Sequence, residues 1–246
     1  MRIRKPVLVK VSLLLFAVAA TAVPLGTVSA APTLVAHWKM DEASGATQMV
    51  DSSGNNNNGS LTNVETGLAG HIGKSYYFGR VGLPSFADVP HSNTLNPGSQ
   101  DITLSMYAKF PNVPPAAVGD YDMVRKGLSS TSGGSYKMEI FPKKTTNGIV
   151  GRGYCFFKGS SGRAQLVKGP DLSDDQWYFI QCKKTASQIS LTIRSTTGGS
   201  FNRTYTKNVT IGSIANSVNV YVGAKSPAGD DQYTGAMDEV KIEIGS

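Results

Sequence analysis

The last apolar segment of the chain contains an acidic residue that could bind an ion. In residues 235–244, period-two alternation places Asp238 on the same face as Val240, whereas Glu239 and Lys241 fall on the opposite, solvated face. A carboxylate at the edge of an apolar face is costly unless it is paired, hydrogen-bonded or bound to a metal. The pattern therefore predicts one of two roles for Asp238: an anchor that closes the fold, or a ligand to an ion.

Two cysteines lie in strand-like surroundings. Cys155 is in Gly-Tyr-Cys-Phe-Phe, and Cys182 ends Tyr-Phe-Ile-Gln-Cys. In an exported protein an even pair of cysteines indicates one disulfide, and the alternative is two free, buried thiols. Because the CxxC spacing of zinc sites does not occur, we expect a disulfide between Cys155 and Cys182 rather than a zinc site.

Three tyrosines and an arginine are the candidates for contacts with a ligand. Sugar binding needs aromatic faces that stack on sugar rings and polar groups that orient the hydroxyls. Tyr121, Tyr154 and Tyr233 lie beside loops that could rim a cleft, and Arg125 follows the first of them closely. The alternative for each tyrosine is an ordinary half-buried position in a sheet.

The centre of the chain is basic. Residues 120–185 hold eleven basic residues against six acidic ones. Clustered positive charge raises the local concentration of anionic partners, which makes an acidic polysaccharide or wall polymer a candidate ligand. The alternative is a solvated surface that keeps the protein soluble.

These side chains must be positioned by β-strands, because helical periodicity is hard to find after Ala31. Short β-rich runs recur between clusters of Gly, Ser, Asn, Thr and Pro. Many short strands with turns between them indicate a sandwich or jelly roll. The expected strands span residues 34–40, 75–79, 102–110, 121–126, 135–141, 149–157, 164–168, 177–183, 188–194, 203–210, 218–223 and 236–244.

An ordered set of short motifs supports a more specific assignment. Residues 34–244 resemble the laminin G-like, concanavalin A-like jelly rolls that are common in exported bacterial proteins. The resemblance implies two antiparallel sheets packed face to face, with the first and last strands as neighbours. The motifs are AHWKMDEASG (36–45), DSSG (51–54), GSL (59–61), GHIGKSYYF (70–78), ADVPH (87–91), DITLSMYA (101–108), VRKG (124–127), QWYFI (176–180), VG (222–223) and GAMDEVKI (235–242).

The resemblance also implies a calcium ion where the first and last strands meet. Hard cations take carboxylate and carbonyl oxygens as ligands. Asp238 would supply one carboxylate and Asp51 another, and Asp41 or backbone oxygens of the Asn-rich loop would complete the shell. The alternative is that Asp51 caps its own turn and Asp238 accepts hydrogen bonds from backbone amides.

The residues do not match the catalytic patterns of the enzymes that share this type of fold. Jelly-roll glycoside hydrolases carry Glu-x-Asp-x-Glu on one strand, and the nearest match, Glu239 to Glu243, has Lys241 at the central position. Jelly-roll lyases combine an Arg-x-Glu-x-Arg strand, a Gln-x-His strand and a late tyrosine, and that combination is not found. We therefore expect no catalytic residues.

The first thirty residues have the order of a secretory signal peptide. Arg2, Arg4 and Lys5 precede an apolar stretch, and Val28-Ser29-Ala30 supplies a small-residue cleavage site. Removal of residues 1–30 leaves 20 basic and 17 acidic residues, a balance too weak to favour nucleic acid as a partner. Residues 31–246 fit a single all-β domain.

We therefore predict a secreted jelly roll that binds carbohydrate or glycoconjugate, including acidic polysaccharide, and holds a structural calcium ion without catalysing a reaction. A cell-envelope or protein adhesion domain is the alternative. A polysaccharide lyase or glycoside hydrolase with an unrecognised site is a further one.

Overall fold

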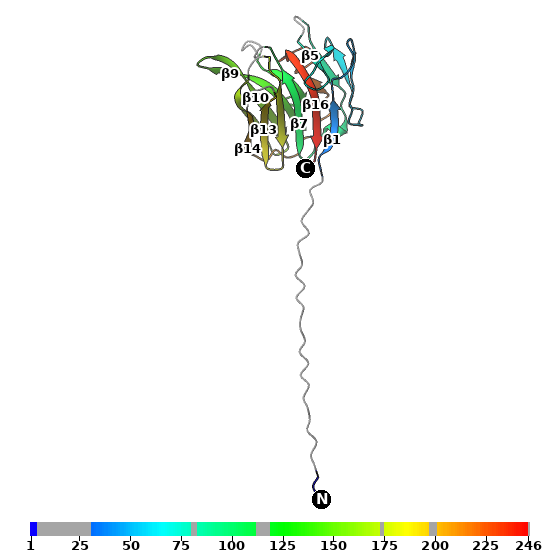
Figure 1. Cartoon of the computed structure of the whole chain (residues 1–246), viewed down its shortest axis with the longest axis vertical. Helices are drawn as coiled ribbons and strands as arrows, with labels where there is room; N and C mark the ends of the chain where they lie inside the picture. The colour runs from blue at the N-terminus through cyan, green and yellow to red at the C-terminus, as the bar shows by residue number, and fades with distance from the viewer. Residues whose placement is uncertain (4–30, 80–82, 112–118, 173–174, 197–200, 246) are drawn as a thin grey trace.

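The computed structural model describes residues 1–3, 31–79, 83–111, 119–172, 175–196 and 201–245. These residues form strands β1 to β16 and one short 3-10 helix, η1 (Asn93–Leu95) (Figure 1). Residues 4–30, which make up most of the predicted signal peptide, lie outside the described residues. No helix in the described ranges is long and apolar enough to cross a membrane.

The strands make two antiparallel sheets, which confirms the predicted two-sheet sandwich. Sheet A has the order β14-β13-β12-β7-β16-β5-β4, and β1 pairs with β16 beside β5. The strands of sheet A are β1 (Thr33–Trp38), β4 (Glu65–Ala69), β5 (Lys74–Phe78), β7 (Ile102–Lys109), β12 (Tyr178–Lys184), β13 (Gln188–Ser195), β14 (Asn202–Asn208) and β16 (Gly235–Ile244).

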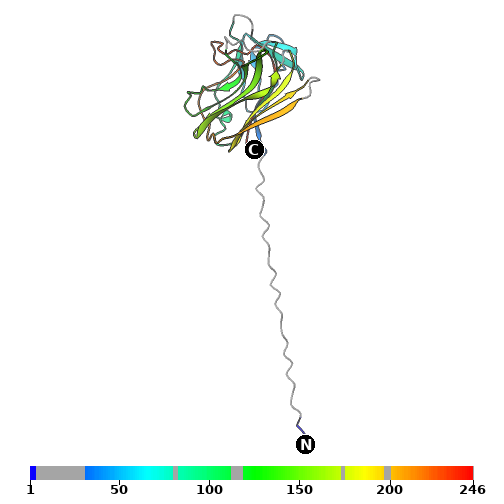
Figure 2. The same ribbon diagram turned by 90° about the vertical axis from the view of Figure 1, so that its left-hand side faces the viewer.

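Sheet B lies across the core from sheet A (Figure 2). Its order is β11-β10-β9-β8-β15-β6-β3-β2. The strands of sheet B are β2 (Gln48–Met49), β3 (Gly59–Thr62), β6 (Phe86–Val89), β8 (Tyr121–Lys126), β9 (Ser135–Thr145), β10 (Gly148–Gly159), β11 (Gly162–Leu172) and β15 (Val220–Val222).

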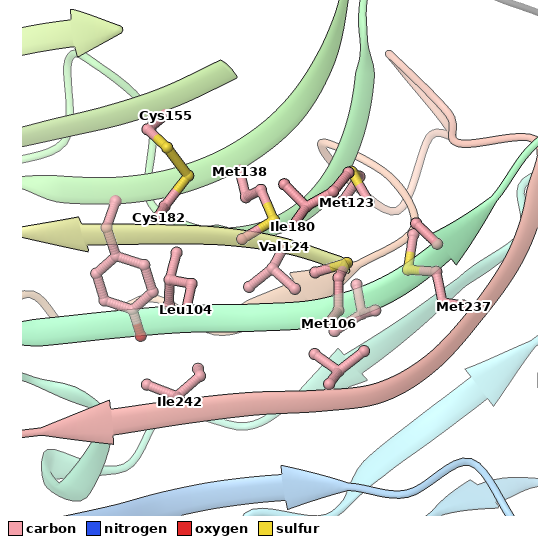
Figure 3. Packing of buried hydrophobic residues seen from close by; sticks show 14 of the residues in the cluster. Leu104, Met106, Met123, Val124, Met138, Cys155, Ile180, Cys182, Met237 and Ile242 are labelled. Atoms are coloured by element: carbon pink, nitrogen blue, oxygen red, sulfur yellow. A yellow bond between two sulfur atoms is a disulfide. The ribbon is translucent and has the colours of Figure 1, made fainter. Parts of the chain in front are cut away.

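Apolar side chains from the inner faces of both sheets fill one core. Met106 of sheet A and Met138 of sheet B are both fully buried and lie between the layers (Figure 3). Each large apolar side chain buried in this way contributes about 1.5–3 kcal/mol. Alternate residues of each long strand therefore face inward, and the residues between them form the outer faces of the sandwich.

A disulfide joins the two sheets across this core. Cys155 of β10 is bonded to Cys182 of β12, with 5.6 Å between their Cα atoms and a sequence separation of 27 (Figure 3). The predicted pairing is confirmed. In the chain-entropy account, closing a loop of this size stabilises the fold by about 3 kcal/mol.

The first and last strands are neighbours, as the resemblance implied. Trp38 lies opposite Val240, and Thr33 lies opposite Ile244. Strand β16 thus forms the centre of sheet A, between β7 on one side and β1 and β5 on the other.

A β-bulge in β16 changes the predicted face of Asp238. Between Asp238 and Lys241 the register with β7 shifts by one residue, and Glu239 has a φ of 54°. Met237 lies opposite Ala108 and faces the core, so Asp238 lies opposite Tyr107 on the outer face. The prediction that Asp238 shares a face with Val240 is therefore wrong, because one extra residue reverses the alternation.

Candidate functional site

The outer face of sheet B carries a set of charged and aromatic side chains. In β9, Met138 and Ile140 face the core, so Lys137 and Glu139 point to the outer face. Antiparallel pairing aligns these two with residues of β8 and β10 that face the same way. The pairs are Glu139 with Asp122 and Tyr154, and Lys137 with Arg125 and Phe156.

A groove of about 770 Å³ lies over this face. We call it the sheet B groove. Five of its lining side chains are basic and two are acidic. The lining residues are Asp120, Arg125, Leu128, Ser129, Ser130, Lys137, Tyr154, Phe156, Arg163, Ala164, Gln165, Lys207, Lys225 and Asp231.

The floor of the groove is a buried network of ion pairs around Arg125. The Arg125 Nε donates to both carboxylate oxygens of Asp122 at 3.0 Å, and its Nη2 donates to Glu139 Oε1 at 2.9 Å. Lys137 also bonds to Glu139 Oε1. Arg125 is only 4% exposed and Glu139 is 0% exposed. Such buried ions are tolerated when they are paired and hydrogen-bonded.

The acidic residues of the network differ in how well they are paired. Asp231 Oδ2 accepts a bond from Lys225 Nζ at 3.0 Å. Asp120 Oδ1 and Glu139 Oε2, by contrast, are buried and have no hydrogen-bond partner among the described residues. Asp120, Asp122 and Asp231 each offer an oxygen, and these oxygens lie within 4.8 Å of one another.

Burial and mutual repulsion set the protonation behaviour of these groups. Burial raises the pKa of Glu139 well above its ordinary value, and the charges of Asp122 and Asp120 raise it further, against the opposing effect of Lys137. Burial likewise raises the pKa of Asp120, helped by Asp122 and Asp231. Both shifts favour the protonated, uncharged form of these two carboxyl groups.

Aromatic rings form the apolar part of the groove. The Tyr154 ring stacks on Phe141 with 5.8 Å between centroids, and its hydroxyl donates to Gln165 Oε1 at 3.0 Å. The Lys137 Nζ lies 5.0 Å from the centroid of the same ring, within the range of a cation–π contact. Tyr154 is therefore held rigidly on the floor of the groove.

A second hollow of about 320 Å³ continues from the first toward β15. The two hollows share Arg125, Leu128 and Lys225 as lining residues. Tyr221 lines the second hollow, and its ring packs edge-on against Phe86 with 6.1 Å between centroids. The two hollows are thus adjacent.

The structure separates the four residues that the sequence suggested for ligand contacts. Arg125 and Tyr154 both lie in the sheet B groove. Tyr121 and Tyr233, in contrast, are part of the core, where their rings meet edge-on at 5.6 Å. Tyr233 is 0% exposed and donates its hydroxyl to the carbonyl of Lys109, so neither ring is available to a sugar at the surface.

The three carboxylates suggested for calcium have separate tasks in the structure. Asp51 accepts bonds from the backbone amides of His37, Ser53 and Asn57, each at 2.9 Å, which makes it the cap of the Asn-rich turn. Asp41 Oδ1 accepts a bond from the Lys74 amide at 2.8 Å. The described acidic cluster with oxygens close enough for one ion is a different set, Asp120, Asp122 and Asp231.

Asp238 holds the turn that precedes β5. Its Oδ2 accepts a bond from the Ile72 amide at 2.7 Å, whereas Oδ1 is buried without a hydrogen-bond partner in the described part of the chain. Burial raises the pKa of Asp238 to about 6. This geometry matches the fold-closing role that was one of the two predicted alternatives.

Sequence reasoning missed four acidic residues of the groove floor. Asp120 and Asp122 are two positions apart at the start of β8, the spacing that places two side chains on one face of a strand, and Glu139 has the same spacing from Lys137 on β9. Asp231 comes from the loop before β16. The alternation of side chains along β8 and β9 could be predicted from the sequence. The pairing of β8 with β9, and the approach of the loop before β16 to β8, could not.

Comparisons with known proteins identify the type of fold but no family. No protein-family model matches the chain, and no curated protein matches it. Domain 4 of AbnA, a GH43 extracellular arabinanase from Geobacillus stearothermophilus, in complex with arabinotriose, is similar with a TM-score of 0.53 and 16% identity, covering 87% of this chain and 93% of that chain. The binding domain of Botulinum neurotoxin DC in complex with SialylT has a TM-score of 0.52 and 12% identity, covering 85% and 47% of the two chains. The LG1–3 region of the laminin α2 chain has a TM-score of 0.46 and 18% identity, covering 64% and 30%. The first two similarities show that the chain has a β-sandwich fold that is also found in these two domains.

Proposed function

We propose that the chain is a secreted, non-catalytic module that binds acidic polysaccharide or an acidic glycoconjugate in the sheet B groove. The observation that carries the proposal is the lining of the groove, where two basic side chains, Arg163 and Lys207, occur together with the rings of Tyr154 and Phe156. The other three basic side chains of the lining are ion-paired with carboxylates of the network. Basic side chains that converge on a hollow attract and orient anionic groups. The rings of Tyr154 and Phe156 supply apolar surface for sugar rings.

The structural neighbours support a sugar ligand. One neighbour is a domain with bound arabinotriose, and another is a toxin binding domain in complex with SialylT. The disulfide between Cys155 and Cys182 supports an exported location. A bound calcium ion is also part of the proposal.

The test is binding to a panel of acidic and neutral polysaccharides at about 0.05 M and about 0.5 M salt, a range over which screening of exposed charges becomes severe. We expect acidic polymers to bind and the affinity to fall at least tenfold at the higher salt. The variant Arg163→Ala/Lys207→Ala, which changes two basic residues of the groove, should bind at least tenfold more weakly.

The matched control is Lys143→Ala/Lys144→Ala. It removes the same charge from exposed residues of β9 that do not line the groove, and it should change affinity less than twofold. Equal losses in both variants would assign binding to net charge rather than to the groove. Binding of neutral polymers without salt dependence would contradict an acidic ligand.

A glycoside hydrolase is the second candidate, because carboxylate oxygens converge in a groove of suitable size. Retaining hydrolases hold two carboxyl groups about 5 Å apart, one of them as a nucleophile. Both oxygens of Asp122 accept bonds from Arg125, which weakens it as a nucleophile. We therefore expect no new reducing ends or unsaturated products when the protein is incubated with the polymers that it binds.

A further inference from the structure

Four carboxylates from three separate parts of the chain converge at the floor of the sheet B groove. Asp120 precedes β8 and Asp122 belongs to it, Glu139 comes from β9, and Asp231 comes from the loop before β16. The backbone brings that loop to β8, because the Asp122 amide donates to the Asp231 carbonyl at 2.8 Å. The cluster is thus assembled by long-range pairing and not by one acidic run.

The basic residues around the cluster leave part of its negative charge uncompensated. Three cations face the four carboxylates: Arg125 bonds to Asp122 and Glu139, Lys137 bonds to Glu139, and Lys225 bonds to Asp231. These bonds leave two buried oxygens, Asp120 Oδ1 and Glu139 Oε2, without a hydrogen-bond partner in the described ranges.

The buried, unpartnered oxygen of Glu139 points to a missing ligand. Glu139 is 0% exposed, and its Oε2 has no hydrogen-bond partner in the described part of the chain. A buried carboxylate oxygen that no donor satisfies costs free energy, and a bound cation is one of the few ways to remove that cost.

We propose that Asp120, Asp122 and Asp231 bind one divalent cation of the calcium class at the floor of the sheet B groove, next to the buried carboxyl group of Glu139. Two oxygens that each lie about 2.4 Å from one ion are at most about 4.8 Å apart. The three aspartates satisfy this limit, since their oxygens lie within 4.8 Å of one another. An all-oxygen ligand set with several carboxylates is typical of hard cations.

The position of the cation differs from the one that the family resemblance implied. Asp120 and Asp231 line the groove, so a cation held there would face a bound sugar, and its remaining coordination positions would be open to sugar oxygens. Binding of a cation at this position does not depend on the identity of the polysaccharide. Binding of the metal alone can therefore be tested separately.

The alternative is a proton shared between Asp120 and Glu139, which would also balance the surplus negative charge. The two explanations differ in their response to metal. A shared proton leaves the protein indifferent to calcium, whereas a cation site binds calcium at one defined stoichiometry and is stabilised by it.

The experiment is calorimetric titration of CaCl₂ into the chelator-treated protein, with thermal melting in parallel. We expect saturable binding of one ion per chain and a melting temperature that rises with calcium. Asp120→Asn should weaken calcium binding at least tenfold. Asp231→Asn, which changes a residue in an accessible loop, should weaken calcium binding to the same extent. It replaces Asp120→Asn as the test if that variant folds poorly.

Two control variants fix the location. Asp230→Asn changes the residue next to Asp231, whose side chain bonds to Ser226, and should alter calcium affinity less than twofold. Asp41→Asn tests the position suggested by the family resemblance and should also have little effect. Loss of calcium binding in Asp41→Asn but not in Asp120→Asn would overturn the proposal.

The absence of any binding heat and of any shift in melting temperature would also overturn it. In that case Glu139→Gln should be at least as stable as the parent protein, as a shared proton requires. Polysaccharide binding measured in chelator separates the two proposals, because retained binding without a calcium response contradicts only the cation site.

Discussion

At the scale of single residues, Arg125 is the side chain on which the candidate site depends most. Its guanidinium forms a planar fork that meets Asp122 through two oxygens and Glu139 through a third. A lysine could not reproduce this geometry, since its ammonium group is a single point charge. Arg125 was predicted as a ligand contact because of its place in a basic region, and the structure shows that it also neutralises buried acids.

Replacing Arg125 should therefore destabilise the protein. Arg125→Met leaves Asp122 and Glu139 buried with less compensation, and removal of one partner of a buried ion pair costs about 3–5 kcal/mol. Urea unfolding followed by tryptophan fluorescence measures this loss. Arg163→Met, at an exposed groove residue, is the control, with an expected loss below about 0.5 kcal/mol. Equal stability of the two variants would contradict the buried network.

Asp238 gives a pH prediction. Burial raises its pKa to about 6, whereas an unfolded chain has a value of about 3.9. The folded state thus binds the proton more tightly, so ionised Asp238 costs up to about 3 kcal/mol above pH 6, and this cost disappears as the pH falls to about 4. Asp238→Asn keeps an oxygen for the Ile72 amide and carries no charge. It should be more stable than the parent protein at pH 7.5 and equal to it near pH 4.

Urea unfolding at both pH values in the presence of chelator checks this expectation. The same pair of measurements in calcium decides between the two predicted roles of Asp238. A fold-closing anchor gives the same difference with and without calcium. A variant that is less stable than the parent protein only in calcium would show that the carboxylate ligates the ion.

At the scale of strands, the sequence predicts alternation well and register poorly. The alternation of β9 and β10 is visible in the sequence, and the structure keeps it. The bulge in β16 was not predictable, because Glu239 takes its positive φ without a glycine to mark it. Strands β2, β3, β4 and β6 were missed, because each is at most five residues long and rich in small or polar residues.

The disulfide makes a prediction at this scale, because it joins β10 of sheet B to β12 of sheet A. Cys155→Ala/Cys182→Ala should lower the free energy of unfolding by about 3 kcal/mol, with a range of about 2–5 kcal/mol. Chemical unfolding of both proteins, with and without reductant, measures the difference. The reductant should destabilise only the parent protein. A parent protein that responds to reductant no more than the variant would contradict a stabilising bond.

At the scale of the whole molecule, the two sheets divide the tasks. Sheet A brings the first and last strands, β1 and β16, together. Asp238 of β16, and Asp51, which forms an isolated bridge to β1, secure turns by accepting bonds from backbone amides. Sheet B presents the groove. Asp238, the acidic residue of the last strand, therefore has a role in the fold. The binding surface depends on residues that only the pairing of distant strands brings together.

The continuous pair of hollows predicts how affinity depends on ligand length. The hollows share Arg125 and Lys225 but have different aromatic residues, Tyr154 in the first and Tyr221 in the second. Oligosaccharides long enough to reach both hollows should bind more tightly than short ones. Tyr221→Ala should remove that advantage. It should weaken the binding of long ligands about tenfold through lost aromatic contact and leave the binding of short ligands unaffected.

Titration calorimetry over an oligosaccharide series measures this dependence on length. Tyr77→Ala is the matched control, because Tyr77 lines a separate hollow on sheet A. An equal loss at every length would contradict this prediction, because a residue that only long ligands reach cannot affect the binding of short ones.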